Sequence, residues 1–142
     1  MDAIQISRSG LDVEWRRMEV IALNLANVNT SRTAAGGNYL PLRLVSGPVE
    51  SFGTVLSREG GAPVQPGGVR VYGIEETDHG VRRAYEPGHP HADADGFVSY
   101  PNVSHAEEMS LMVKTARAYE ANLIALATAQ QIYSSALQIG RQ

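Results

Sequence analysis

The residues best suited to chemistry lie in one short run, His89-Pro90-His91-Ala92-Asp93-Ala94-Asp95-Gly96. Two imidazoles and two carboxylates are side chains that transition metals bind. A calcium loop also needs a third acidic position and a distal glutamate at fixed spacing, and the run supplies neither. We therefore interpret it as a proline-fixed loop whose Asp-Gly turn leads into a strand, and we expect no metal.

Other catalytic patterns are equally weak. His79 and His105 are isolated, without a serine and an acid at a spacing that indicates a catalytic triad. The paired glycines do not form a phosphate-binding motif, because no Gly-x-Gly-x-x-Gly or Gly-Lys-Ser/Thr sequence is present. The chain has no cysteine, which excludes disulfides, thiolate zinc sites and a cysteine nucleophile. The sequence thus predicts neither an enzyme nor a cofactor.

Length and charge narrow the class further. A chain of 142 residues is one domain by the usual size of domains. Its net charge is −3, and the pairs Arg16-Arg17 and Arg82-Arg83 are isolated, so we expect no nucleic-acid partner. No run of about 20 apolar residues is present, so we expect no membrane insertion. The first residues lack the basic and apolar regions of a cleavable signal peptide.

Glycine and proline divide the chain into three parts. All seven prolines lie between residues 30 and 101, and these residues break helices and mark turns. The division predicts an α+β fold, in which terminal helices (1–30 and 102–142) pair as a coiled-coil-like axial domain around a small β-rich middle (31–101). Within that middle we expect a flexible insertion at Arg58–Gly68 and five strands: Tyr39–Ser46, Phe52–Ser57, Val69–Ile74, Val81–Glu86 and Gly96–Tyr100.

Apolar residues recur every seven positions in both predicted helices, a spacing typical of coiled-coil packing. The N-terminal stripe is Ile4, Leu11, Met18 and Leu25, and a second line, apolar only in its later half, includes Ile21. The C-terminal helix has two stripes, one of Met109, Ala116, Leu123 and Leu137, interrupted by the polar Gln130, and one of Met112, Tyr119, Leu126 and Tyr133. We expect these positions to make subunit contacts, and Asn24 and Asn27 to bond across helices at the end of the coiled segment.

The C-terminal helix has an unusual surface. Between Glu120 and Arg141 there is no charged residue, over about 30 Å of helix. A membrane span is a poor explanation, because Asn122 and Gln130 lie inside this stretch. A helix covered on several sides by other subunits explains it better, since a surface helix normally shows water a charged face. A low-charge helix exposed in a monomer is the alternative.

Several segments resemble the bacterial flagellar rod and hook proteins. Ser9-Gly10-Leu11, residues 17–21 and residues 23–30 (Leu-Asn-Leu-Ala-Asn-Val-Asn-Thr) are similar to the N-terminal motif of that family. The C-terminal helix matches through Glu108-Met109 and Tyr119-Glu120-Ala121-Asn122. Between them, the segments that resemble the FlgC type of proximal rod subunit are Tyr85-Glu86-Pro87, His89-Pro90, Ala92-Asp93, Gly96-Phe97-Val98 and Pro101-Asn102-Val103.

The resemblance implies a structural subunit of the flagellar basal body. Its partners would be copies of itself, other rod subunits and the flagellar type III export apparatus, which exports such proteins without a cleaved signal. The subunit would polymerise in the periplasm through its terminal helices, which form the inner layer, and help to transmit torque. A helical adaptor or export-related binding module, forming a small closed complex, is the alternative function.

Overall fold

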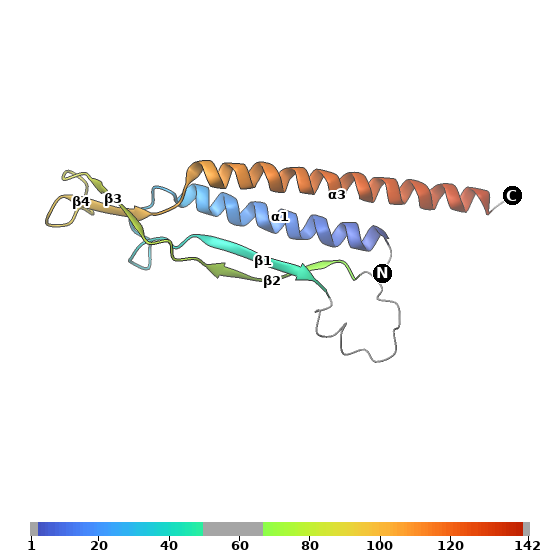
Figure 1. Ribbon diagram of the computed structural model, residues 1–142, viewed down its shortest axis with the longest axis horizontal. Coiled ribbons are helices and arrows are strands. Elements are labelled where there is room, and N and C mark those ends of the chain that lie inside the picture. Colours follow the sequence, from blue (N-terminus) through green and yellow to red (C-terminus); the bar gives the residue numbers. More distant parts are fainter. Residues whose placement is uncertain (1–2, 50–66, 141–142) are drawn as a thin grey trace, which may run out of the picture.

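The computed structural model describes residues 3–49 and 67–140. Figure 1 shows an elongated molecule in which two long helices lie side by side and two small hairpins lie along and beyond them. The element order is α1 (Ala3–Asn27), β1 (Leu42–Pro48), β2 (Val69–Glu76), β3 (Val81–Tyr85), β4 (Phe97–Pro101) and α3 (His105–Ile139). The predicted α+β fold, with paired terminal helices around a small β middle, is confirmed.

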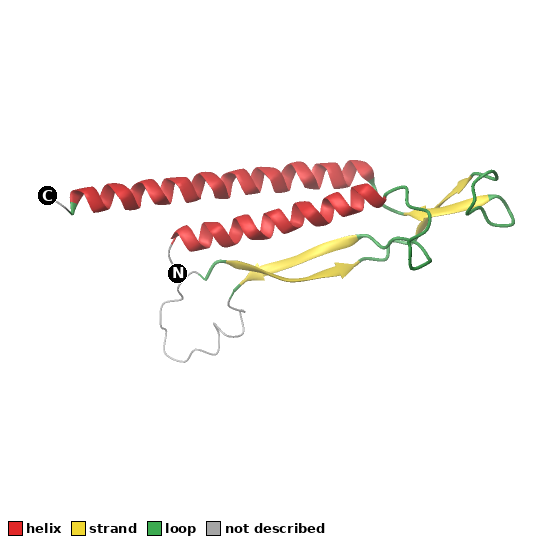
Figure 2. Ribbon diagram, turned by 180° about the vertical axis from the view of Figure 1, so that it is seen from behind, coloured by secondary structure: helices red, strands yellow, loops and turns green. Residues whose placement is uncertain are grey.

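The two helices run in opposite directions, so the end of α1 lies beside the start of α3 (Figures 1 and 2). Helix α3 begins at a Ser104 cap, whose Oγ accepts a hydrogen bond from the Glu107 N–H at 3.3 Å. Asn102, two residues before this cap, donates its side-chain amide to the His79 carbonyl. Acidic Glu107 and Glu108 in the first turn suit the positive end of the helix dipole.

The helices approach closely at Gly10, a buried residue of α1. A Cβ atom added there would lie 2.6 Å from the Asn122 side-chain oxygen of α3. Glycine in a helix costs about 1 kcal/mol relative to alanine. The cost is accepted here because only a residue without a side chain leaves room for the Asn122 amide.

The β1–β2 hairpin packs along α1. Its strands are antiparallel, and the register shifts between Val45 and Ser46. Arg17 of α1 donates to the Ser46 hydroxyl at 2.9 Å, and the Ser9 hydroxyl accepts from the Val69 N–H at 3.1 Å. These bonds join α1, β1 and β2 into one unit.

The strand boundaries differ from the prediction. The first strand is Leu42–Pro48 and not Tyr39–Ser46, because Pro41 has no N–H with which to extend the ladder. The strand predicted at Val69–Ile74 is β2, which continues to Glu76. The predicted strand Phe52–Ser57 and most of the insertion Arg58–Gly68 lie outside the described residues.

The β3–β4 hairpin lies at the end of the molecule remote from the C-terminus (Figure 1). The strand predicted at Val81–Glu86 ends at Tyr85, and the one predicted at Gly96–Tyr100 is Phe97–Pro101. Gly96 belongs to the turn, where its φ of 79° is a left-handed conformation that glycine adopts without strain. The strand therefore begins one residue later.

The apolar core is small. Among the described residues, the buried hydrophobic side chains are Val13, Val20 and Ile21 of α1 and Val98 and Tyr100 of β4. The buried residues of α3 are Glu108 and Thr115, neither of them apolar. None of the described helices is long and apolar enough to cross a membrane. Most of the apolar surface of α3 is therefore left outside the core.

The close approach at Gly10 makes a testable prediction. Gly10→Ala gains about 1 kcal/mol of helix propensity but overpacks the site by about 1–3 kcal/mol against Asn122. In an Asn122→Ala background the same substitution should stabilise the chain by about 1 kcal/mol. Unfolding in urea, followed by circular dichroism for both single variants and the double variant, should give a coupling free energy above about 1 kcal/mol. Additive effects would show that the two side chains do not compete for space.

Candidate functional site

The loop with two histidines and two aspartates is held by its own polar atoms. Asp93 Oδ1 accepts from the Phe97 N–H at 2.8 Å and from the Asp95 N–H at 3.0 Å, and its other oxygen pairs with Arg83. His89 Nδ1 accepts from the His91 N–H. No group of three histidine, aspartate or glutamate side chains placed to hold a metal occurs within residues 3–49 and 67–140.

A buried polar junction joins three elements where α1 ends and α3 begins. It consists of Asn24 from α1, Arg43 from β1 and Glu108 from α3. The Asn24 oxygen accepts from the Leu42 N–H at 2.8 Å, and its amide donates to the Leu42 carbonyl at 2.9 Å. The same amide donates to Glu108 Oε2 at 3.2 Å. Asn24 is fully buried, and these contacts leave it no unpaired polar atom.

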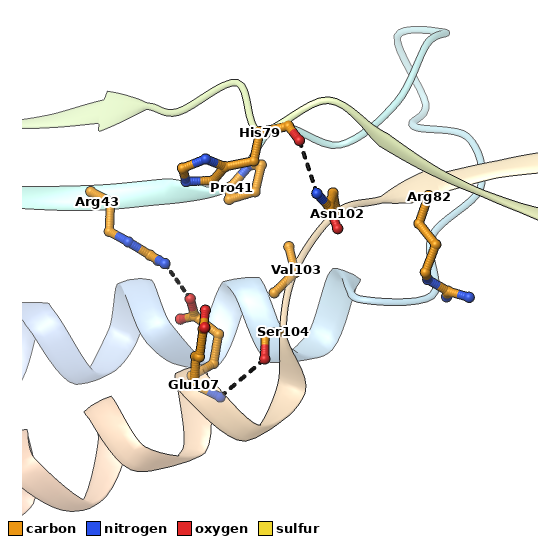
Figure 3. Close-up of a pocket in the computed structure, with 9 residues that line it drawn as sticks. Pro41, Arg43, His79, Arg82, Asn102, Val103, Ser104 and Glu107 are labelled. Carbon is orange, nitrogen blue, oxygen red and sulfur yellow. Dashed lines mark hydrogen bonds and ion pairs between the residues drawn. The ribbon is translucent and has the colours of Figure 1, made fainter.

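Glu108 is the charged member of the junction and is only 1% exposed. Its second carboxylate oxygen pairs with the Arg43 guanidinium, which reaches across from β1 (Figure 3). The Tyr39 hydroxyl completes the site by donating to the Asn24 oxygen at 2.9 Å. Burial, followed by the charge of Glu108, raises the pKa of Tyr39, so the phenol keeps the proton it donates.

An open polar groove lies beside the junction, between the start of α3 and the two hairpins (Figure 3). Its lining residues are Pro41, Arg43, His79, Arg82, Asn102, Val103, Ser104, Glu107 and Glu108. Several of these groups already have partners: Arg43 and Glu108 pair with each other, and Ser104 caps α3. The groove thus exposes the edge of a structural contact and contains no nucleophile positioned by a base.

The face of α3 that packs against α1 lies one position before the first predicted stripe. It contains Glu108, Thr115, Asn122 and Ala129, spaced seven residues apart; the first two are buried and the others half-buried. Polar and small side chains of α3 therefore fill the middle of the contact, and larger ones flank it: the Tyr119 ring lies 6.2 Å from that of Trp15 in α1. The predicted stripe lies beside it, with Met109 45%, Leu123 49% and Leu137 54% exposed.

The remaining predicted positions divide by burial. Ile21 and Asn24 are buried between the elements. Tyr133 is exposed. The others are half-buried and lie at the margins of the helix contact: Ile4, Leu11, Met18, Leu25, Asn27, Met112, Ala116, Tyr119 and Leu126. Their burial in the single chain is incomplete, so each retains surface that a neighbouring subunit can cover.

Within the single chain, the two asparagines that we expect to bond across helices differ. Asn24 bonds across to Glu108 of α3. Asn27 stays within its own segment: its amide donates to the Leu23 carbonyl and its oxygen accepts from Thr30. As the last residue of α1, Asn27 finds the free groups of the helix end and the following turn within reach, and α3 has only just begun there.

Helix α3 extends beyond its partner. The contacts of Asn24 with Glu108 and of Gly10 with Asn122 place Ala3, the first residue of α1, near the level of Ala129. Residues 130–140 form an overhang, in which every residue is exposed. The projecting end is plain in Figures 1 and 2. Its apolar members are the large side chains Ile132, Tyr133, Leu137 and Ile139, the last 77% exposed.

Three important residues were not among the predicted contact positions: Gly10, Arg43 and Glu108. Glu108 gave no sign of burial, since a charged residue is rarely buried without a partner. The heptad spacing of Glu108, Thr115 and Asn122 is the signal that indicates their shared face. Nothing local to Arg43 indicates its role, because its partner lies 65 positions away.

Because only Asn24 belongs to the junction, replacing Asn24 and replacing Asn27 should lower the stability of the chain by different amounts. Asn24→Ala should destabilise the chain by about 2 kcal/mol or more, because it leaves the Leu42 N–H and Glu108 without their buried partner. Asn27→Ala is the matched control, and it should cost about 0.5–1 kcal/mol because its bonds lie at an exposed helix end. Thermal unfolding of both variants measures the difference. Equal losses would contradict the central role of the junction.

The stability that the ionised Asp93 carboxylate gives to its loop should be lost only in strong acid. Hydrogen bonds, first that from the Phe97 N–H, lower the pKa of Asp93 below its usual 3.8. A lowered pKa contributes stability above the unfolded value, and this is lost as the pH falls through the folded value. An NMR titration of Asp93 should therefore have its midpoint below pH 3.8. In Arg83→Gln the midpoint should move upward, and a midpoint at or above 3.8 in the unsubstituted chain would refute the geometry.

Comparison with known proteins agrees with this arrangement. Residues 94–139 match the family described as flagellar basal body rod FlgEFG protein, C-terminal. The flagellar basal-body rod protein FlgC of Bacillus subtilis is 36% identical over 145 residues, covering 98% of this chain and 97% of the relative. FlgC of Borreliella burgdorferi is 35% identical, covering 96% and 95%, and that of Salmonella typhimurium is 32% identical, covering 99% and 98%.

These relatives extend over nearly the whole chain, beyond the roughly half on which the resemblance rested. Paired terminal helices with an exposed apolar surface suit a protein that acts by assembling, and no catalytic arrangement competes with that reading in the described residues. The chain belongs to the FlgC family of flagellar basal-body rod proteins and is a structural subunit, not an enzyme.

Proposed function

We propose that this rod subunit polymerises through the outward apolar residues of α3, which pack against helices of neighbouring copies and of other rod subunits. The observation that carries the proposal is the arrangement of α3. Its two buried residues, Glu108 and Thr115, are polar. Its exposed side carries the large apolar residues Met109, Leu123, Ile124 and Leu137. In a chain that acts as a monomer, the large apolar residues of such a helix would face α1 and the polar residues would face solvent.

The overhang supports the same conclusion. No residue from 121 to 140 is charged. The large apolar side chains of the overhang are exposed and have no partner within the described chain. Covering apolar surface contributes about 25 cal/mol per Å². Many modest contacts of this kind hold a subunit in a polymer. They also leave the free chain incomplete until neighbours arrive.

The elongated shape suits mechanical work. A contact between different surfaces of successive subunits, repeated without closing a ring, produces a helical tube. Two antiparallel helices in such a tube present stiff rods that can carry torque across the periplasm. The hairpins lie beside and beyond the helix pair (Figure 2), and we assign them to contacts at the outer part of the rod.

The same proposal includes export through the flagellar type III apparatus. Passage requires that the chain unfold at little cost. The small apolar core of the described residues, five hydrophobic side chains in all, is what a weakly stable free subunit has. The assembled rod then supplies the stability that the free subunit lacks.

Charge on the exposed stripe should block assembly. Leu123→Asp and Leu137→Asp place a carboxylate where we propose that a neighbour packs, at a site already open to water in the free chain. We expect at least a tenfold loss of the subunit from purified hook–basal bodies, measured by quantitative mass spectrometry, together with loss of swimming in soft agar.

Thr128→Asp is the matched control. Thr128 is an exposed polar position on the same helix, about 140° around the axis from Leu123. It should reduce assembly less than the other two variants. Circular dichroism should show equal helix content in all three. Normal motility in Leu123→Asp and Leu137→Asp would contradict the proposal. A small closed complex of the unsubstituted chain, without polymer, would favour an adaptor instead.

A further inference from the structure

Helix α3 is attached to the rest of the helical domain through one polar side chain. Within residues 3–49 and 67–140, the side-chain hydrogen bonds from α3 to the α1–β1–β2 unit are those of Glu108 with Asn24 and Arg43. Everything else that holds α3 against this unit is packing. Among the described residues, Glu108 is therefore the one point at which side-chain hydrogen bonds fix the alignment of α3 with α1.

The packing itself specifies alignment weakly. After Glu108, the middle of the contact with α1 carries the short side chains Thr115, Asn122 and Ala129 at seven-residue spacing. The larger side chains beside them repeat at the same spacing, as Met112, Tyr119 and Leu126, so a shift of one heptad sets large residues where large ones were. Helix α3 has 35 residues and α1 has 25, so α1 has free length along which to shift. A shift of one heptad toward the C-terminus of α3 moves α1 by about 10 Å.

The close contact at Gly10 does not prevent such a shift. In the observed alignment Gly10 leaves room for Asn122. After a one-heptad shift Gly10 would face Ala129, which is smaller than asparagine and needs less room. Steric fit therefore permits both alignments.

We propose that Glu108 is a register lock, which fixes how far α1 lies along α3. In a shifted alignment the carboxylate of Glu108 would lose both Asn24 and Arg43, and these two residues would face Thr115, which has no charge to offer. Separating the partners of a buried, hydrogen-bonded ion pair is far more costly than losing an apolar contact. A single buried polar residue sets the register of coiled coils for the same reason.

The lock has a consequence for assembly, and this consequence rests on the proposed function. A shift of one heptad would lay α1 over most of the overhang and cover surface that we assign to neighbouring subunits. By holding α1 at its observed level, Glu108 keeps that surface open. The lock itself concerns the single chain and is tested without assembly.

Distance measurement between two spin labels tests the register. The chain has no cysteine, so Arg16→Cys and Ser135→Cys provide two unique sites, both exposed. Arg16 lies near the level of residue 116, so the labels are separated by about 28 Å along the helix axis, and a one-heptad shift reduces this to about 18 Å. Labelled subunit is diluted into unlabelled subunit, which removes distances between molecules from double electron–electron resonance.

Two substitutions separate polarity from shape. Glu108→Met removes the carboxylate, keeps a long side chain and favours a helix. We expect it to add a population at distances shorter by up to about 10 Å. Glu108→Gln still offers an oxygen to Asn24 and is the matched control, expected to keep the single native distance. A single native distance in Glu108→Met would overturn the proposal.

A transposed lock is the second test. The double variant Glu108→Thr and Thr115→Glu moves the carboxylate by one heptad on the same face, and we expect the shorter distance to dominate. Circular dichroism reports the helix content of each variant. Retention of the native distance would overturn the proposal. So would loss of the helices in both Glu108→Met and the double variant, because a register lock requires the helix pair to survive without it. Neither result depends on whether Leu123→Asp assembles.

Discussion

The hydrogen bond between the buried carboxylate of Glu108 and the amide of Asn24 is the interaction on which the arrangement of this subunit depends. Asn24 also satisfies the backbone of Leu42, so the same amide ties β1 to α1. Arg43 returns from β1 to neutralise Glu108. A buried charge is tolerated only when its partners are complete. The charge of Glu108 is therefore satisfied only when α1, β1 and α3 come together at this point.

Away from the junction, the helix pair is held by small residues and close approach. Gly10 and the short side chains of α3 let the two backbones come near, beside the small apolar core of Val13, Val20 and Ile21. Many large apolar side chains of α3 remain exposed on the surface of the pair. Exposed apolar surface of this kind suits a subunit that neighbours cover, which agrees with membership of the FlgC rod family.

The pattern of the sequence predicted the elements well and their contacts less well. Glycine and proline, absent from most of the two ends, marked the helices to within a few residues, because their effect on the backbone is local. The heptad stripes were real, but a stripe shows only that one side of a helix is apolar. It does not say whether the chain or a neighbour covers that side, so the sequence alone did not show that Glu108 and Thr115, one position before the first stripe, are the buried residues of α3. Nor did it show which asparagine bonds across the helix pair within one chain, since local partners are as good as distant ones.

The sequence by itself thus determined the α+β class, the two long helices, the uncharged end of α3 and, through its motifs, the rod resemblance. All of these depend on residues near one another along the chain or on composition. The tertiary structure alone decided which heptad positions face inward, how far α3 projects beyond α1, and that Arg43 and Glu108 meet across 65 positions. These depend on long-range closure of the fold. There the cost of an unpaired buried charge outweighs the small differences in packing between one heptad and the next.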